Sequence, residues 1–180
     1  MTRYAIVGLG LAALLGACAG SSDSDIAATP AAGNAAATAP SAADYVARAG
    51  ASDLFEIQSS QLALQKAQSA AVKSFAQMMV SHHTNTTAQV TAAARKSGMN
   101  PAPPALPADK QRMLTALQSA SGAAFDTLYA QQQVTGHQEA LALHQSFAQG
   151  GSDPNLKAVA ATAVPIVQAH LDRARRLPNG

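Results

Sequence analysis

Apolar and small residues repeat every three to four positions along four long segments of the chain, which is the period of an α-helix with one buried face. Residues that end helices bound these segments. Gly98 and the proline-rich residues 101–104 follow the second segment, and Gly150-Gly151 follows the third. We therefore expect long helices over residues 44–68, 71–96, 122–149 and 154–177.

The connections between these helices predict how they are arranged. The turns near Ser69 and Gly151 are short, so each joins two antiparallel neighbours, whereas the connection over residues 99–121 is long and contains a short helical pattern at 109–120. Two helical hairpins joined in this way are typical of an all-α, ferritin-like four-helix bundle with one long crossover that carries a short extra helix. We place this bundle at residues 44–178.

The composition agrees with a helical protein and excludes some classes of partner. Of 180 residues, 44 are alanine, only 4% are aromatic and none is tryptophan. Alanine favours helices, and no stretch alternates with the period of a strand. Twelve Lys and Arg against ten Asp and Glu leave no basic block, so a nucleic-acid partner is not expected.

The amino terminus is typical of an exported protein. Arg3 precedes an uncharged run over residues 4–19, which is too short to span a bilayer. Its end, Leu15-Gly16-Ala17-Cys18, resembles the lipobox of bacterial lipoproteins, in which the signal is cut before a cysteine that then carries lipid. We expect a signal peptide at 1–17 and lipidation of Cys18; cleavage at a later position to give a soluble periplasmic protein is the alternative.

The segment at 18–43 is expected to be a disordered tether, because Ala, Ser, Thr, Gly and Pro dominate it and it cannot bury enough apolar surface to fold. In known lipoprotein sorting, Ala19 rather than an aspartate after the cysteine points to the outer membrane. The expected location is thus the periplasmic face of the outer membrane, with outer-membrane lipid bound through Cys18.

Each long helix places a titratable residue on its inward, otherwise apolar face. These residues are Glu56, His83, His137 and His170. Glu56 lies about 14 residues before the first turn and His83 about 13 after it, so at about 1.5 Å per residue they should lie at the same height. His137 is also mid-helix, and Gln133, one turn away from it, is level with His170. We expect these four residues to form one buried polar centre, with Gln133 beside it.

Further polar residues lie near this centre. His144 shares the face of His137, and we expect it to be a second polar residue of the core. Asp126 and Tyr129, near the start of the third long helix, are expected to cap that helix and fasten the crossover. His82 should lie at the edge of the core, half exposed.

A family resemblance adds to this interpretation. The run Lys73-Ser74-Phe75-Ala76-Gln77-Met78-Met79-Val80 leads into His83-Thr84, and Phe125-Asp126-x-x-Tyr129 precedes His137. With Leu156-Lys157-x-x-Ala160 leading to His170-Leu171, the chain from about Tyr45 to Leu177 resembles the bacterial envelope family called domain of unknown function 4142. That family usually has Asp where this chain has His82. The resemblance implies a ferritin-like fold and an envelope location, and it implies no reaction.

The residues of the centre restrict its chemistry. A di-iron carboxylate bundle needs a Glu-x-x-His motif on each of two helices, and this chain has only two Glu, neither of which begins one. Ferroxidase or oxygenase activity is therefore not expected. The sequence also contains no Ser-His-Asp order, Gly-rich phosphate loop or Cys-x-x-Cys motif, so the interpretation leans towards a protein that is not an enzyme. Three imidazoles and one carboxylate could hold a single Cu, Zn or Fe ion, and Met78, Met79 and the His82-His83 pair favour copper.

Two functions stay open at this point. One is a non-catalytic envelope lipoprotein, a binding or stress-related module whose polar centre fixes the register of the bundle. The other is a metal-binding bundle that uses the core His and Glu residues.

Overall fold

The computed structural model describes residues 39–178, and this part of the chain is helical with no strand. The expected signal peptide at 1–17, Cys18 and all of the expected tether except its last five residues lie outside the described residues. The helices are α1 (Ala42–Lys66), α2 (Ala70–Lys96), α3 (Ala108–Ser119), α4 (Gly122–Gly150) and α5 (Pro154–Ala174).

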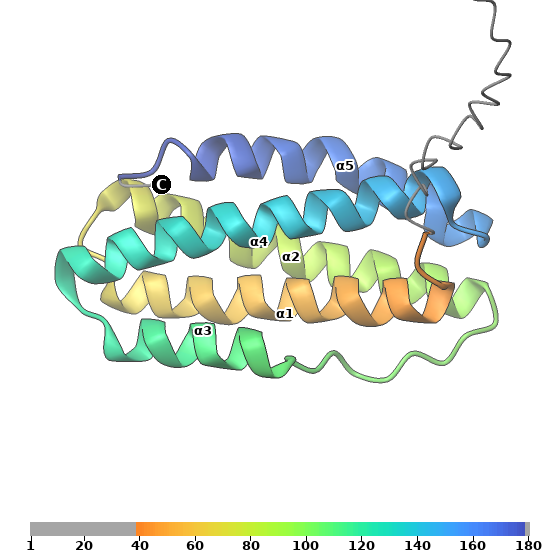
Figure 1. The fold of residues 1–180 in the computed structure, drawn as a ribbon, viewed down its shortest axis with the longest axis horizontal. Helices are drawn as coiled ribbons and strands as arrows, with labels where there is room; N and C mark the ends of the chain where they lie inside the picture. Colours follow the sequence, from red (N-terminus) through yellow and green to blue (C-terminus); the bar gives the residue numbers. More distant parts are fainter. Residues whose placement is uncertain (1–38, 179–180) are drawn as a thin grey trace, which may run out of the picture. The chain divides into compact units, whose positions relative to one another are not determined.

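The four long helices form a four-helix bundle, as the sequence predicts. The hairpin α1–α2 packs beside the hairpin α4–α5, with α1 next to α4 and α2 next to α5. Figure 1 shows that α2 and α4 run in the same direction, so the chain must cross the length of the bundle between them. The extended residues 99–107 and α3 make this crossover, and α3 packs on the outside against α1 and α4.

Local interactions explain where the helices begin and end. Ser41 accepts a hydrogen bond from the Asp44 backbone N–H, so α1 begins two residues earlier than expected, within the segment predicted as tether. At the end of α2, Gly98 has a φ of 76°, and Met99 donates to the carbonyl of Ala94, which completes a Schellman motif.

Helix α5 ends at Ala174, three residues before the predicted boundary. Its last turn tightens, because Arg176 bonds to the carbonyl of Arg173 and Leu177 to that of Ala174. Pro178 follows, and the residue before a proline is disfavoured in helical geometry. The helix therefore stops earlier than the apolar pattern suggests.

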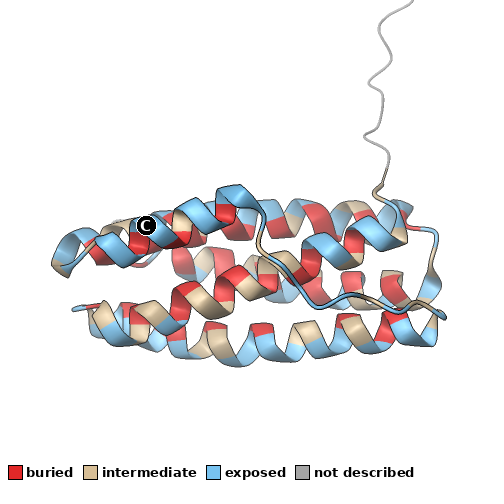
Figure 2. Ribbon diagram, turned by 90° about the horizontal axis from the view of Figure 1, so that it is seen from below, coloured by how far each residue is buried: buried red, intermediate tan, exposed pale blue. Residues whose placement is uncertain are grey.

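The core has two apolar ends and a polar middle. One cluster of buried residues includes Phe75, Met79 and Phe125, and the other includes Tyr45 and Phe147. Figure 2 shows the buried positions facing inward along all four long helices. Between the two clusters the helices contribute polar side chains instead. A polar layer in mid-bundle costs stability unless its groups are paired, so its composition bears on function.

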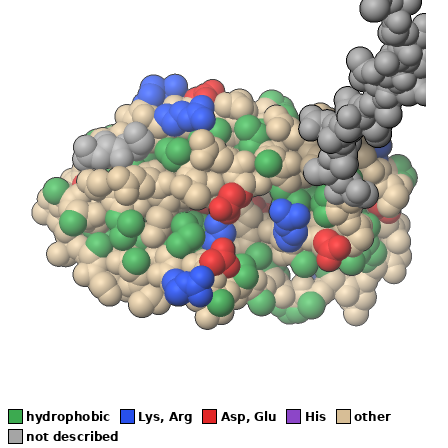
Figure 3. Space-filling view, viewed as in Figure 1, with side chains coloured by type: hydrophobic (Ala, Val, Ile, Leu, Met, Phe, Trp, Pro, Cys, Tyr) green, Lys and Arg blue, Asp and Glu red, His purple; other side chains and the backbone are tan. Residues whose placement is uncertain are grey.

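The surface carries few distinctive features. None of the helices between residues 39 and 178 is long and apolar enough to cross a membrane. On the face seen in Figure 3, charged side chains are scattered among uncharged ones and do not gather into one patch.

Candidate metal centre

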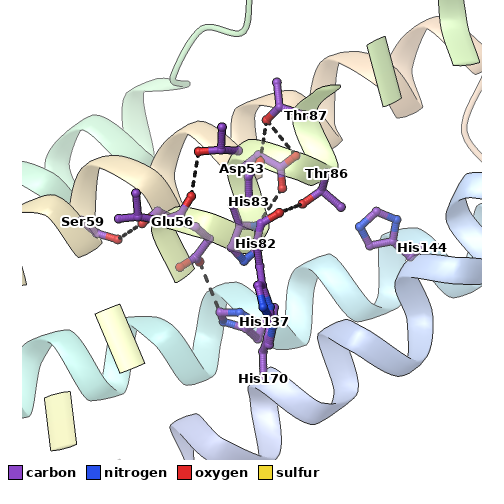
Figure 4. A network of polar contacts seen from close by, with 12 residues as sticks. Asp53, Glu56, Ser59, His82, His83, Thr86, Thr87, His137, His144 and His170 are labelled. Carbon is purple, nitrogen blue, oxygen red and sulfur yellow. Dashed lines mark hydrogen bonds and ion pairs between the residues drawn. The ribbon is translucent and has the colours of Figure 1, made fainter. Parts of the chain in front are cut away.

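Three histidines from three helices meet in the middle of the bundle. His83 of α2, His137 of α4 and His170 of α5 each offer one ring nitrogen, and these nitrogens all lie within 4.8 Å of one another. The ring centroids are 5.4 to 5.6 Å apart. All three residues are buried between the apolar clusters, and Figure 4 shows them side by side with their neighbours from α1. The helical faces counted from the sequence thus converge.

One nitrogen of each ring has no hydrogen-bond partner among the described residues, although it is fully buried. These atoms are His83 Nε2, His137 Nε2 and His170 Nδ1. An unpaired polar atom in a protein interior costs about 1–3 kcal/mol. Three such atoms in one place therefore call for an explanation.

The other nitrogen of each ring is engaged. His83 Nδ1 lies 2.8 Å from Asp53 Oδ1, and His137 Nδ1 donates to the backbone carbonyl of Gln133 at 2.8 Å. His170 Nε2 is 2.8 Å from Nδ1 of His82. A carbonyl only accepts, so Nδ1 of His137 carries the proton and its Nε2 has a free lone pair when the ring is neutral. Such outer partners orient metal-binding imidazoles in known sites.

The pKa values of these rings differ because their surroundings differ. Burial lowers the pKa of His137, and it lowers that of His170 to about 2, with the neighbouring histidines adding to the effect. Burial also acts to lower the pKa of His83, but the hydrogen bond and charge of Asp53, aided by Glu56, outweigh it and raise this pKa. His137 and His170 are therefore neutral at pH 7, which is the form that binds metals.

Glu56 lies beside the three histidines and is the most buried carboxyl group of the bundle. Its side chain is 2% exposed, and Oε1 lies 3.9 Å from His137 Nδ1, on the edge of the ring that faces Gln133. Its Oε2 has no partner among the described residues. The space for this carboxylate depends on Gly136, because a Cβ there would lie 2.8 Å from Oε1. Glu56 is thus a neighbour of the converging nitrogens and is not among them.

A small pocket reaches the centre from one side. Its volume is about 10 Å³, about enough for one water molecule. Its lining residues include Asp53, His83 and His170 of the centre, and also His144 and Ile166. Ile166 is 40% exposed, and it is the only large apolar side chain among the described residues that is exposed.

Comparison with known proteins identifies the family. Residues 27–177 match the model of the domain of unknown function DUF4142. The chain belongs to the DUF4142 family. Comparison with curated protein sequences gives no match.

Solved structures with the same fold include metal-bound ones. CopM in the Cu(II)-bound form is 15% identical, with a TM-score of 0.65 over 77% of this chain and 96% of that chain. CopM in the Cu(I)-bound form is 16% identical, with a TM-score of 0.65 over 76% and 94% of the two chains. A DUF305 fragment from Deinococcus radiodurans is 15% identical, with a TM-score of 0.66 over 77% and 95%. At such identities the likeness concerns the fold.

Of the neighbours of the trio in this DUF4142 chain, Asp53 was not singled out from the sequence, and His82 was expected only as a half-exposed residue at the edge of the core and as part of the His82-His83 pair. Asp53 lies one turn before Glu56 on α1, and its carboxylate also accepts from Thr87 Oγ1 at 3.0 Å. His82 is exposed, yet its ring stacks on His170 at a centroid distance of 5.0 Å. The available signals were the position of Asp53 one helical turn before Glu56 and that of His82 directly before His83.

The remaining predicted polar residues are buried and lie outside the trio. Gln133 donates from Nε2 to Ser59 Oγ at 3.3 Å, so its side chain links α4 to α1. Its backbone carbonyl accepts from Nδ1 of His137. His144 Nδ1 is 3.0 Å from the hydroxyl of Tyr45. Burial lowers the pKa of His144 to about 4.

The expected capping role of Asp126 and Tyr129 is wrong. Asp126 lies in the second turn of α4, past the positions that cap it, and accepts from the backbone N–H groups of Gln68 and Ser69. It therefore holds the turn between α1 and α2. The hydroxyl of Tyr129 is 2.8 Å from Ser60 Oγ, which ties α4 to α1.

Proposed function

We propose that this protein binds a single transition-metal ion, copper before zinc or iron, through His83, His137 and His170. The observation that carries this proposal is the set of three buried nitrogens that lack partners while the opposite nitrogen of each ring is held. A network that served only to fix the register of the bundle would pair these atoms, because each unpaired one costs free energy. A metal ion would satisfy all three at once.

The donor set supports the choice of metal. Imidazole suits copper, zinc and iron, and for a given nitrogen site the affinity among divalent ions is highest for copper. CopM, which shares the fold, has been solved in copper-bound forms. Nitrogens at about 2.0–2.1 Å from one ion lie about 3.3–3.6 Å apart, so small rotations of the rings would bring them into place.

The residues do not fit the di-iron carboxylate centre of other ferritin-like bundles. That centre needs several Glu ligands, and Glu139, the second Glu of the chain, bonds to Lys110 at 2.6 Å with its own side chain 58% exposed. The proposal is therefore one of binding, and it assigns no redox reaction to the protein.

The proposed setting is the cell envelope, on the periplasmic face of the outer membrane. The lipobox-like residues Leu15-Gly16-Ala17-Cys18 support it. Lipid at Cys18 would hold the bundle on a tether near the membrane, where it could bind metal that enters the envelope.

Metal content tests the proposal directly. The mature chain with Cys18→Ser would be loaded with Cu(II) or Zn(II), freed of excess metal by gel filtration and analysed by mass spectrometry for metal. We expect one ion per chain, lost in His83→Gln, His137→Gln and His170→Gln. His144→Gln, which removes a buried histidine outside the trio, is the matched control and should keep its ion. If the folded wild-type chain retains none, the trio is a structural network and the proposal fails.

A further inference from the structure

Two carboxylates lie behind the histidines, and both come from α1. Asp53 is 5% and Glu56 1% exposed, and they are one helical turn apart. Asp53 Oδ1 is 2.8 Å from His83 Nδ1, and Glu56 Oε1 is 3.9 Å from His137 Nδ1. Each carboxylate thus lies behind a different ring, on the side away from the nitrogen that is free.

No permanent cation neutralises these groups in the described part of the chain. The ion pairs there that involve Lys or Arg join Lys110 to Glu139 and Arg175 to Asp172. Asp53 accepts from Thr87 Oγ1 at Oδ2, and its Oδ1 is hydrogen-bonded to Nδ1 of His83. Glu56 Oε2 is buried without a partner. A buried carboxylate without a cation is costly.

A bound metal ion would supply the missing positive charge. With neutral imidazoles, two carboxylates and a divalent ion give a centre of zero net charge, whereas a monovalent ion leaves one negative charge buried. A metal ion bound to the unpaired nitrogen of a ring would lie about 6–7 Å from a carboxylate beside the opposite nitrogen of the same ring. At an effective dielectric constant of about 20, one extra positive charge at that distance favours binding on the order of tenfold to a hundredfold per carboxylate.

We propose that Asp53 and Glu56 make the centre selective for the charge of its metal, so that it prefers a divalent ion such as Cu(II) or Zn(II) to a monovalent one such as Cu(I) or Ag(I). This inference rests on the proposed function. In this proposal Glu56 acts on the metal ion through its charge and does not bind the ion as a ligand.

Paired affinity measurements test this role. Dissociation constants for Zn(II) and Ag(I) would be measured by competition titration on the mature Cys18→Ser chain and on Glu56→Gln, which removes the charge and keeps the shape. We expect Glu56→Gln to weaken Zn(II) binding at least tenfold more than Ag(I) binding. Ser59→Ala, which removes the hydroxyl that bonds to Gln133 and to the Glu56 carbonyl, changes no charge and should leave the ratio of the two constants unaltered.

A second variant keeps the test independent of how Glu56→Gln folds. Asp53→Asn should move the ratio in the same direction, because its amide oxygen can still accept from His83 while the charge is lost. If both ions bind and neither variant changes the ratio, the charge proposal is overturned and the metal site stands. If neither ion binds to the wild-type chain, it is the proposed function that fails.

Discussion

Replacing Asp53 should destabilise the bundle, although the sequence pattern alone does not single this residue out. Asp53→Ala leaves Nδ1 of His83 buried without an acceptor, whereas Thr87 keeps its second acceptor, the carbonyl of His83 at 2.9 Å. One hydrogen bond to a charged group contributes about 1.5–3 kcal/mol, and breaking a buried ion pair costs about 3–5 kcal/mol. We therefore expect a loss of about 3 kcal/mol when His83 is protonated and about 1.5 kcal/mol when it is neutral.

The pH dependence of this loss follows from the raised pKa of His83. A histidine whose pKa is higher in the folded than in the unfolded state adds stability that is fully present below about pH 6.5 and disappears as the pH rises through the folded-state pKa. The destabilisation by Asp53→Ala should thus be greater at pH 6 than at pH 8. The pKa of His83 should also fall in the variant, because burial lowers it and only the charge of Glu56 is then left to raise it.

Urea unfolding of the metal-free chain, followed by circular dichroism at both pH values, measures the free energies, and NMR titration measures the pKa. Asp53→Asn should cost about half as much, since an amide oxygen can still accept. Asp172→Asn, at a half-exposed position of α5 where the carboxylate pairs with Arg175, is the control and should stay within about 0.5 kcal/mol. The reasoning is refuted if Asp53→Ala matches this control, or if its cost does not decrease from pH 6 to pH 8.

Three further predictions concern other parts of the chain. Because the pKa of His144 is lowered to about 4, stability should fall as the pH drops from 6.5 towards 4, by roughly 3 kcal/mol from this residue; thermal melting of His144→Gln should show a flatter pH dependence, and an equal one would contradict the assignment. Asp126→Ala should lower the free energy of unfolding by about 2–3 kcal/mol, since the backbone N–H groups of Gln68 and Ser69 lose their acceptor; a change under 0.5 kcal/mol in urea titration would show that the turn holds without it. Cys18→Ala should abolish labelling with radioactive palmitate in cells, and unchanged labelling would exclude lipidation at this residue.

The fold could be predicted from the sequence because each of its determinants is local. The three-to-four-residue repeat, the glycine and proline residues at the helix ends and the lengths of the turns all act within a few residues. The end of α5 differs from the predicted one, because Pro178 and the tightened last turn outweigh an apolar pattern that continues to Leu177.

The site could be predicted only in part. Counting along helix faces places His83, His137 and His170 on inward faces and within about one helical turn of the same height, because height and inward direction follow from the helical repeat. The pairing of Asp53 with His83 depends on how α1 is rotated against α2, which no repeat within one helix reveals. Asp126 illustrates the same limit, since its acceptor role belongs to a turn that lies 57 residues away in sequence.

The position of a bound metal would show whether the three histidines form the site. Crystals of the mature Cys18→Ser chain, grown with Cu(II) or Zn(II), would be measured on both sides of the absorption edge of the metal. We predict one anomalous peak in mid-bundle, about 2.0–2.1 Å from His83 Nε2, His137 Nε2 and His170 Nδ1, with Asp53 and Glu56 outside the ligand shell. Crystals in which these three nitrogens keep their places and the peak is absent, or lies at surface residues, would contradict the account.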